Sequence, residues 1–134
     1  MTIFINTGAF IARFIAADQH HLDSLEKWEL LKAQKLNCIT SNHVIDETLT
    51  LLARRTSYAF SAEKAHLIYQ SNIIQIARPE LAEEQSALKL FEKFADQRVS
   101  FTDCLSFALM KKLKIQTVFS FDRHFKQAGF EIFG

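Results

Sequence analysis

The chain has 134 residues, of which 49% are hydrophobic, and this is enough apolar material for one compact core. We therefore predict a single domain over residues 1–134. The 16 basic and 15 acidic residues leave a net charge of +1, which excludes a strong overall field that would attract nucleic acid. A nucleic-acid partner would have to be held by a local basic patch.

The sequence also indicates a compartment. No segment has the pattern of an export signal, and no apolar run approaches the roughly 20 residues that a membrane helix needs. The two cysteines, Cys38 and Cys104, lie far apart without metal-binding spacing and are typical of reduced core thiols. These features predict a cytoplasmic protein that does not enter a membrane.

Apolar periodicity predicts strands and helices along the whole chain. A strand over 3–6 is followed by a helix over 8–17, a helix over about 20–35 and a strand over 36–40. Next come a helix that is capped by Ser41 or Asn42 and runs to Arg55, a helix over about 58–71 and a strand over 73–77. A helix with Pro79 in its first turn follows, and then a helix over 103–114 that Thr102 and Asp103 open. The last predicted elements are strands over 117–121 and 130–133. Short apolar strands separated by helices favour an α/β domain with a mainly parallel sheet, because parallel neighbours need crossover connections.

In the helix over 20–35, charged residues alternate with Leu22, Leu25, Trp28, Leu30 and Leu31. In the helix after Pro79, the positions that we assign to the core are Leu81, Leu88, Phe91 and Ala95. Most of the 13 phenylalanines are expected to join them.

Four short polar segments stand beside apolar runs and carry candidate ligands. They are Phe4-Ile5-Asn6-Thr7, Asp46-Glu47-Thr48, Ser100-Phe101-Thr102-Asp103-Cys104 and Ser120-Phe121-Asp122-Arg123-His124-Phe125. In parallel sheets, binding sites form outside the carboxyl ends of the strands. Asn6 and Asp122 follow predicted strands, while Glu47 and Asp103 lie near predicted helix starts. All four side chains could therefore face one crevice.

Each of these positions also has a purely structural explanation. Asp122 suits a turn or a helix cap, and Asn6 suits a turn after a strand. Asp103 in a first helical turn would interact favourably with the helix dipole, by about 0.3–1 kcal/mol. Periodicity places Glu47 and Asp46 alike at the edge of the apolar stripe and does not distinguish between them.

The four segments together resemble the PIN-domain ribonucleases, in particular the toxins of VapBC-type toxin–antitoxin pairs. The similarity runs over nearly the whole chain, and the segments around Asp103 and Asp122 are the most specific. It implies a three-layer α/β/α fold with a mainly parallel sheet of four to five short strands. It also implies a cut in RNA that depends on Mg²⁺ or Mn²⁺, a cognate antitoxin and a homodimer.

By position, the resemblance implies a catalytic and metal-binding set that chooses Glu47 over Asp46. The set is Asn6, Glu47, Asp103 and Asp122, with Thr7 and Thr102 as hydroxyl neighbours that hydrogen-bond a carboxylate or a metal-bound water. The residue types agree with this chemistry, because Mg²⁺ is a hard cation that prefers oxygen ligands. Among the basic candidates, Arg123 adjoins Asp122 and is the best placed to contact an RNA phosphate. The others are Arg54, Arg55, Lys111, Lys112, Lys114 and Lys126.

The family has an aspartate where this chain has Asn6. An amide can coordinate a cation weakly but adds no negative charge, so we expect weaker metal binding and impaired cleavage. The amide fits either a natural loss of activity or a deliberate replacement of an aspartate. We favour replacement, since the other three acidic positions are intact and the amide is isosteric.

We therefore predict a metal-dependent endoribonuclease toxin that is impaired at Asn6. The alternative is a catalytically inactive module with the same fold that binds RNA or an antitoxin. A phosphoacceptor signalling domain also uses an acidic α/β crevice with Mg²⁺, but the amide at position 6 disfavours it. The five histidines show no zinc-binding spacing, and we expect His20 and His21 to be surface residues.

Overall fold

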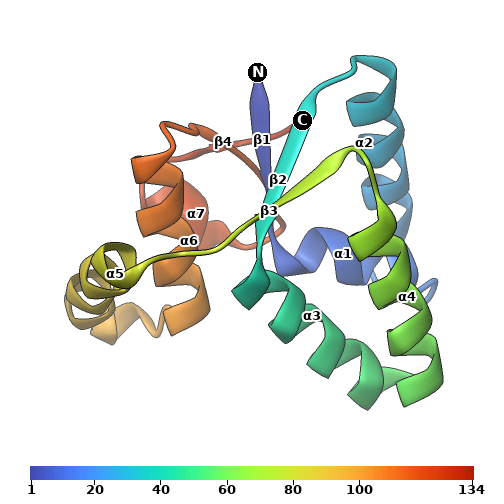
Figure 1. The fold of residues 1–134 in the computed structure, drawn as a ribbon, viewed down its shortest axis with the longest axis horizontal. Coiled ribbons are helices and arrows are strands. Elements are labelled where there is room, and N and C mark those ends of the chain that lie inside the picture. The colour runs from blue at the N-terminus through green and yellow to red at the C-terminus, as the bar shows by residue number, and fades with distance from the viewer.

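The computed structural model describes residues 1–134 as an α/β domain built around one five-stranded parallel sheet (Figure 1). The strands are β1 (Thr2–Ile5), β2 (Asn37–Ser41), β3 (Ile74–Ala77), β4 (Thr117–Phe119) and β5 (Glu131–Ile132). The helices are α1 (Thr7–Phe14), α2 (His21–Ala33), α3 (Asn42–Arg55), α4 (Tyr58–Gln70), α5 (Leu81–Lys93), α6 (Phe101–Lys112) and α7 (Arg123–Gln127), with a 3₁₀ turn at Ala95–Gln97. The predicted fold class is confirmed.

The strand order is β3-β2-β1-β4-β5, so the chain adds strands on one side of β1 before it crosses to the other. In the central register, Phe4 lies between Ile39 of β2 and Val118 of β4. Residues 3–5 of β1 are completely buried, as expected of a central parallel strand that is covered on both faces. The strand order reverses between β1 and β4, and this is where ligands bind in such sheets.

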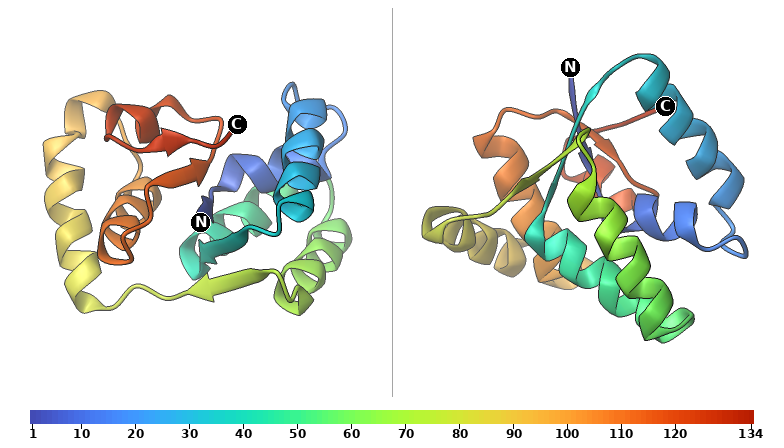
Figure 2. Two further views of the ribbon diagram at one scale, coloured as in Figure 1. Left: turned by 90° about the horizontal axis from the view of Figure 1, so that it is seen from above. Right: turned by 45° about the vertical axis from the view of Figure 1, so that its right-hand side comes forward.

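Helices cover the sheet from both sides. Figures 1 and 2 show α5 and α6 on one side of the sheet and α1, α2 and α4 on the other. Helix α3 packs against α1 and α4 and also reaches α6. No helix combines the length and the apolar character that would let it span a membrane.

Two predicted helix starts are wrong by a few residues. Helix α5 begins at Leu81, so Pro79 precedes the cap instead of lying in the first turn. The Glu80 N–H donates to Glu83 Oε1 at 2.8 Å, and this local bond sets the start. Helix α6 begins at Phe101, because the Ser100 side chain accepts a hydrogen bond from the Asp103 N–H at 3.1 Å.

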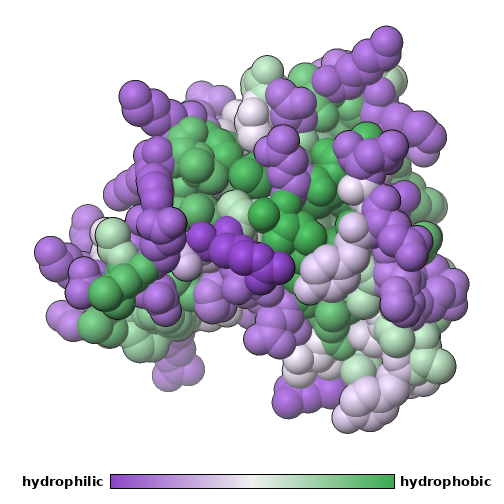
Figure 3. Space-filling model, in the orientation of Figure 1, coloured by the Kyte–Doolittle hydropathy of each residue, from purple (hydrophilic) through white to green (hydrophobic).

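The predicted core face of α5 is also wrong. Leu81, Leu88 and Phe91 are 67%, 50% and 42% exposed, whereas Ala87 and Glu83 are buried. Helix α5 packs closely on α6, and Glu83 stays buried because Lys112 Nζ of α6 donates to its Oε1 at 3.1 Å. Figure 3 shows hydrophobic side chains at the surface of this end of the molecule.

The apolar residues of α2 divide between the core and the surface. Trp28 and Leu31 are buried, but Leu22, Leu25 and Leu30 are exposed. Helix α2 is fixed to α1 by polar contacts as well, since Ser24 Oγ and Trp28 Nε1 both donate to the Ala9 carbonyl, at 2.9 and 3.2 Å. Periodicity of apolar residues could not show this anchor.

The core itself agrees with the composition. It contains eight buried aromatic rings: Phe4, Phe10, Trp28, Phe107, Phe119, Phe125, Phe130 and Phe133. Cys38 and Cys104 are free and buried, as predicted. This packed centre holds the ends of β1 and β4 in place.

Candidate active site

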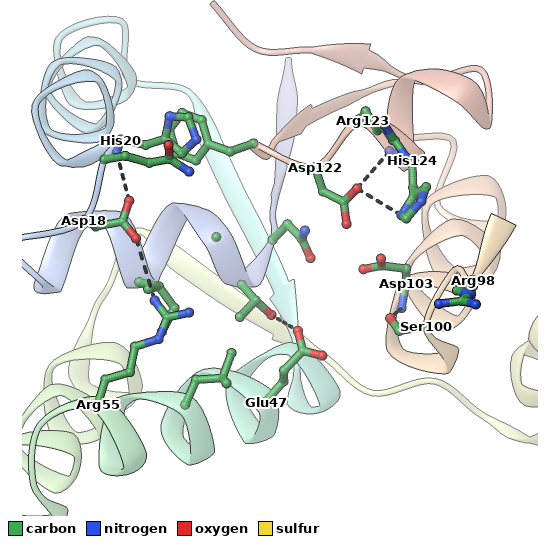
Figure 4. A pocket seen from close by; sticks show the side chains of 17 residues that line it. Asp18, His20, Glu47, Arg55, Arg98, Ser100, Asp103, Asp122, Arg123 and His124 are labelled. Carbon is green, nitrogen blue, oxygen red and sulfur yellow. Dashed lines mark hydrogen bonds and ion pairs between the residues drawn. The ribbon is translucent and has the colours of Figure 1, made fainter.

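A cleft of about 670 Å³ lies beyond the carboxyl ends of β1 and β4, where the strand order reverses (Figure 4). Of the seven predicted site residues, six line it: Asn6, Thr7, Glu47, Asp103, Asp122 and Arg123. The seventh, Thr102, does not. It lines a smaller hollow that shares Glu47 with the cleft, because its place at the second residue of α6 turns it away.

Asn6 is the cap residue between β1 and α1 and is only 4% exposed. Its Nδ2 donates to Ser120 Oγ at 3.2 Å, while its Oδ1 is buried and has no hydrogen-bond partner. An unsatisfied buried polar atom costs about 1–3 kcal/mol, so an oxygen in this state is suited to meet a ligand. Ser120 Oγ also accepts from the Asp122 N–H at 3.0 Å and thereby links Asn6 to Asp122.

Glu47 lies in the second turn of α3, whose start is set by the Ser41 side chain accepting from the Val44 N–H. Thr7 Oγ1 donates to Glu47 Oε1 at 2.5 Å, and this bond orients the carboxylate toward α1. The neighbouring Asp46 is exposed and does not line the cleft. The structure therefore separates the two carboxylates that periodicity left equivalent.

Asp103 is 6% exposed in the first turn of α6. Burial, together with the nearby carboxylates Asp122 and Glu47, raises the pKa of this carboxyl group to about 8. Asp103, Asp122 and Glu47 repel one another when all three carboxylates are ionised, so ionisation of Asp103 costs free energy while no cation is present. A cation placed between them would remove that repulsion.

Asp122 caps α7, where its Oδ1 accepts from the His124 N–H at 2.9 Å. His124 Nδ1 lies 3.0 Å from the same oxygen, although the approach lacks hydrogen-bond geometry. One ligand atom each from Asp103, Asp122 and His124 lies within 4.8 Å of the other two. Oxygen donors predominate in the whole group, which fits Mg²⁺ or Mn²⁺ better than zinc.

The cleft has a basic edge as well as an acidic centre. Arg55, Arg98 and Arg123 all line it, and Arg55 Nη1 lies 3.8 Å from Asp18 Oδ2. Arg98 was not among the predicted basic candidates, and it has a left-handed backbone with φ of 56°. Arg98 lies two residues before Ser100, which caps α6, and this position in the sequence could have indicated that it lies near Asp103. In contrast, Lys112 pairs with Glu83 and Glu80 away from the cleft.

Three further residues were missed or placed wrongly. Ser120 was not selected, although it bridges two predicted ligands. His20 lines the cleft and stacks on Phe121, and His21 Nδ1 lies 2.7 Å from the Ala12 carbonyl oxygen. The two histidines are therefore partly buried, because the loop that carries them folds back onto α1 and the end of β4.

The comparisons with known proteins agree with this geometry. The model of the PIN domain family matches residues 3–131. The 23S rRNA-specific endonuclease VapC20 of Mycobacterium tuberculosis is 33% identical over 128 residues, which cover 96% of this chain and 95% of the relative. A VapC ribonuclease of Archaeoglobus fulgidus is 28% identical, covering 93% of this chain and 80% of the relative.

The solved structures give the same result. The crystal structure of Mycobacterium tuberculosis VapC20, described as a sarcin–ricin loop cleaving toxin, superimposes with a TM-score of 0.85. The alignment covers 96% of this chain and 95% of that chain at 33% identity. The chain belongs to the PIN domain family, and the relatives it matches are VapC ribonucleases.

Proposed function

We propose that this chain is an endoribonuclease toxin of the VapC kind that depends on Mg²⁺ or Mn²⁺ and is impaired by Asn6. The observation that carries the proposal is the convergence of Asn6, Glu47, Asp103 and Asp122, from four distant parts of the chain, on one cleft. The relatives that share the fold over nearly their whole length are named as RNA-cutting enzymes.

The residues present fit a divalent cation. Asp103 and Asp122 would hold it, with Glu47 on the opposite side of the cleft and the unpartnered Asn6 Oδ1 as a neutral fourth ligand. When bound, the cation would lower the pKa of an attacking water and neutralise charge on the phosphate.

The chain's own residues would position the reactants. Thr7 fixes the Glu47 carboxylate, which can orient water or accept its proton. Ser120 ties the loop of Asp122 to Asn6, so the two strand ends move as one unit. Arg123 and Arg98 stand at the edge of the cleft and would bind phosphates beside the cut.

Asn6 would lower activity because the site loses one negative charge at its most buried position. Replacement Asn6→Asp should therefore raise Mg²⁺-dependent RNA cleavage by about 10-fold or more, which corresponds to about 1.4 kcal/mol of transition-state stabilisation. The assay is cleavage of labelled RNA over a range of Mg²⁺ and Mn²⁺ concentrations. The matched control is Asn37→Asp, the same change at an exposed position at the start of β2, and it should have no effect.

Equal cleavage by the Asn6→Asp and unmodified proteins would contradict the impairment. No cleavage by either protein, with RNA or antitoxin binding retained, would instead support the inactive binding module. The residue encoded at position 6 in the source genome would distinguish natural loss of the aspartate from its replacement; we favour replacement because the surrounding carboxylates are intact.

We also propose a cytoplasmic location, a cognate antitoxin and a homodimer. Cleavage of cellular RNA requires access to the cytoplasm, and a toxin of this kind must be restrained by a partner. The exposed apolar side chains of α5, together with Phe101, offer contact surface. Light scattering of the purified chain, alone and with the antitoxin encoded beside it, would measure both assemblies.

A further inference from the structure

An aromatic pair lines the cleft away from the carboxylates. His20 lies in the loop between α1 and α2, and its ring is stacked on that of Phe121 with the centroids 4.3 Å apart and the planes within 1°. Both residues line the same cleft as Asp103 and Asp122, but neither side chain is hydrogen-bonded to the acidic group. The pair is therefore not explained by the proposed metal chemistry.

Within this pair, the Phe121 ring lies on the core side and the His20 ring lies on the side of the solvent. The Phe121 ring packs against the core, its centroid is 5.9 Å from that of Phe119, and Lys27 Nζ lies 5.2 Å from its centroid. His20 is only partly buried, and Phe121 is the one ring stacked on it. No second aromatic ring is stacked on the opposite face of the imidazole, and this is the face that we assign to a flat ligand.

Asp18 connects the backbone of His20 to a cation on the same side of the cleft. The His20 N–H donates to Asp18 Oδ1 at 2.9 Å, and the other carboxylate oxygen of Asp18 lies 3.8 Å from Arg55 Nη1. Asp18 therefore ties the loop and the guanidinium together. Figure 4 shows Asp18, His20 and Arg55 along one side of the cleft, opposite Arg98 and Ser100.

A flat ring with an adjacent cation is what proteins use to bind single-stranded nucleic acid, since bases stack on aromatic side chains while cations follow the backbone. We propose that His20 stacks on an unpaired base of the RNA next to the cut, and that Arg55 contacts an adjoining phosphate. This inference rests on the RNA-cutting function proposed above. Stacking tolerates any base, so His20 would favour unpaired nucleotides in loops over paired ones.

The test is binding of two fluorescent oligomers of about eight nucleotides, a length typical of single-stranded sites. One is oligo(rA), and the other is an abasic ribose-phosphate chain of equal length and charge. Fluorescence anisotropy is measured in EDTA, which prevents metal-dependent cutting. Replacement His20→Ala should weaken oligo(rA) binding about 5- to 100-fold and abasic binding little, because only the former loses a stacking partner.

Two further variants separate stacking from a structural or hydrogen-bonding role. His20→Phe keeps a flat ring and should bind oligo(rA) within about threefold of the unmodified chain, whereas His20→Gln should be as weak as His20→Ala. The control is His66→Ala, which removes an exposed imidazole outside the cleft and should change nothing. In the Asn6→Asp background, His20→Ala should raise KM more than it lowers kcat.

Equal affinity of the His20→Ala and unmodified proteins for oligo(rA) overturns the stacking role and leaves the proposed nuclease intact. The same holds if His20→Gln binds as well as His20→Phe, since a hydrogen bond would then explain the residue. If the unmodified chain binds neither oligomer and the Asn6→Asp protein cuts no RNA, the proposed function fails and the stacking role fails with it.

Discussion

The acidic centre of the cleft and its rim are built in different ways. The acidic centre, formed by Asn6, Glu47, Asp103 and Asp122, stands at or near helix starts, in caps or in the first two turns. The rim, formed by His20, Arg55 and Arg98, stands in a loop, at a helix end and after a 3₁₀ turn. The centre thus rests on regular elements that the core holds in place, and the rim rests on connections.

This difference matches what each part would do under the proposed function. Holding a metal ion requires ligand atoms at fixed positions, which short side chains on packed elements can provide. Contact with an RNA backbone or an unpaired base tolerates more movement, so long side chains and a loop are sufficient. We expect substitutions in the centre to change metal binding and stability, and substitutions in the rim to change RNA affinity alone.

The largest expected effect is on stability and comes from Asp103. Its folded pKa of about 8 lies above the ordinary value of 3.8, so the folded protein holds this proton more tightly than the unfolded chain. Stability without metal should therefore fall as the pH rises from about 4 to about 8, and Asp103→Asn should remove that loss. The gain at pH 8 should be a few kcal/mol, since each pKa unit corresponds to about 1.4 kcal/mol.

Thermal unfolding in EDTA at pH 5 and pH 8 measures this effect. Asp46→Asn is the control, because that carboxylate is exposed and should leave the pH dependence unchanged. Added Mg²⁺ should stabilise the unmodified protein at pH 8 more than the Asp103→Asn variant. Identical pH dependence in the unmodified protein and the Asp103→Asn variant would show that burial and neighbouring carboxylates do not raise the pKa of Asp103.

An intermediate effect is expected from the pair Glu47 and Asp46. In the Asn6→Asp background, Glu47→Gln should lower cleavage about 10- to 100-fold, as changes next to or within metal sites commonly do. Asp46→Asn should leave cleavage within about twofold, since exposed charges far from the reacting atoms contribute little. Initial cleavage rates at saturating Mg²⁺ give the comparison. Equal losses of rate in the two variants would contradict the assignment of Glu47, and not Asp46, to the active site.

The smallest expected effect is from the rim. Arg98→Ala should lower RNA affinity and reduce the slope of log affinity against log salt by about one, because one phosphate contact is lost. Metal affinity measured by calorimetry should not change. Lys114→Ala is the control, since Lys114 also has a left-handed backbone but lies outside the cleft. A salt slope unaltered by Arg98→Ala would exclude this arginine from the RNA path.

Much of the fold followed from local patterns. The strand around Phe4, the Ser41 cap and the helix after it were predicted because short apolar runs and capping side chains act through neighbours in the chain. The predicted core face of α5 was wrong because Glu83, a charged residue, is buried against α6, where the half-exposed Lys112 donates a hydrogen bond to it. That pair joins two helices, so no local pattern contains it.

The candidate site divides in the same way. Asn6, Glu47, Asp103 and Asp122 were selected because the four segments that carry them together resemble the PIN-domain ribonucleases. The bridging hydroxyl of Ser120, the stacking of His20 on Phe121 and the inclusion of Arg98 were not found. Each depends on a contact between residues far apart in the chain or on an unusual backbone angle.

Local periodicity in the sequence predicted the order of the elements, and the resemblance of its short motifs to a family predicted the fold family and the four residues of the acidic centre. Only the tertiary structure decided that Glu47 faces the cleft while Asp46 faces solvent, and that Asn6 Oδ1 is buried without a partner. It also decided that the His20 ring stacks on Phe121 in the same cleft as the carboxylates. The physical reason is that burial and distance arise from packing between separate elements, which one-dimensional spacing does not specify.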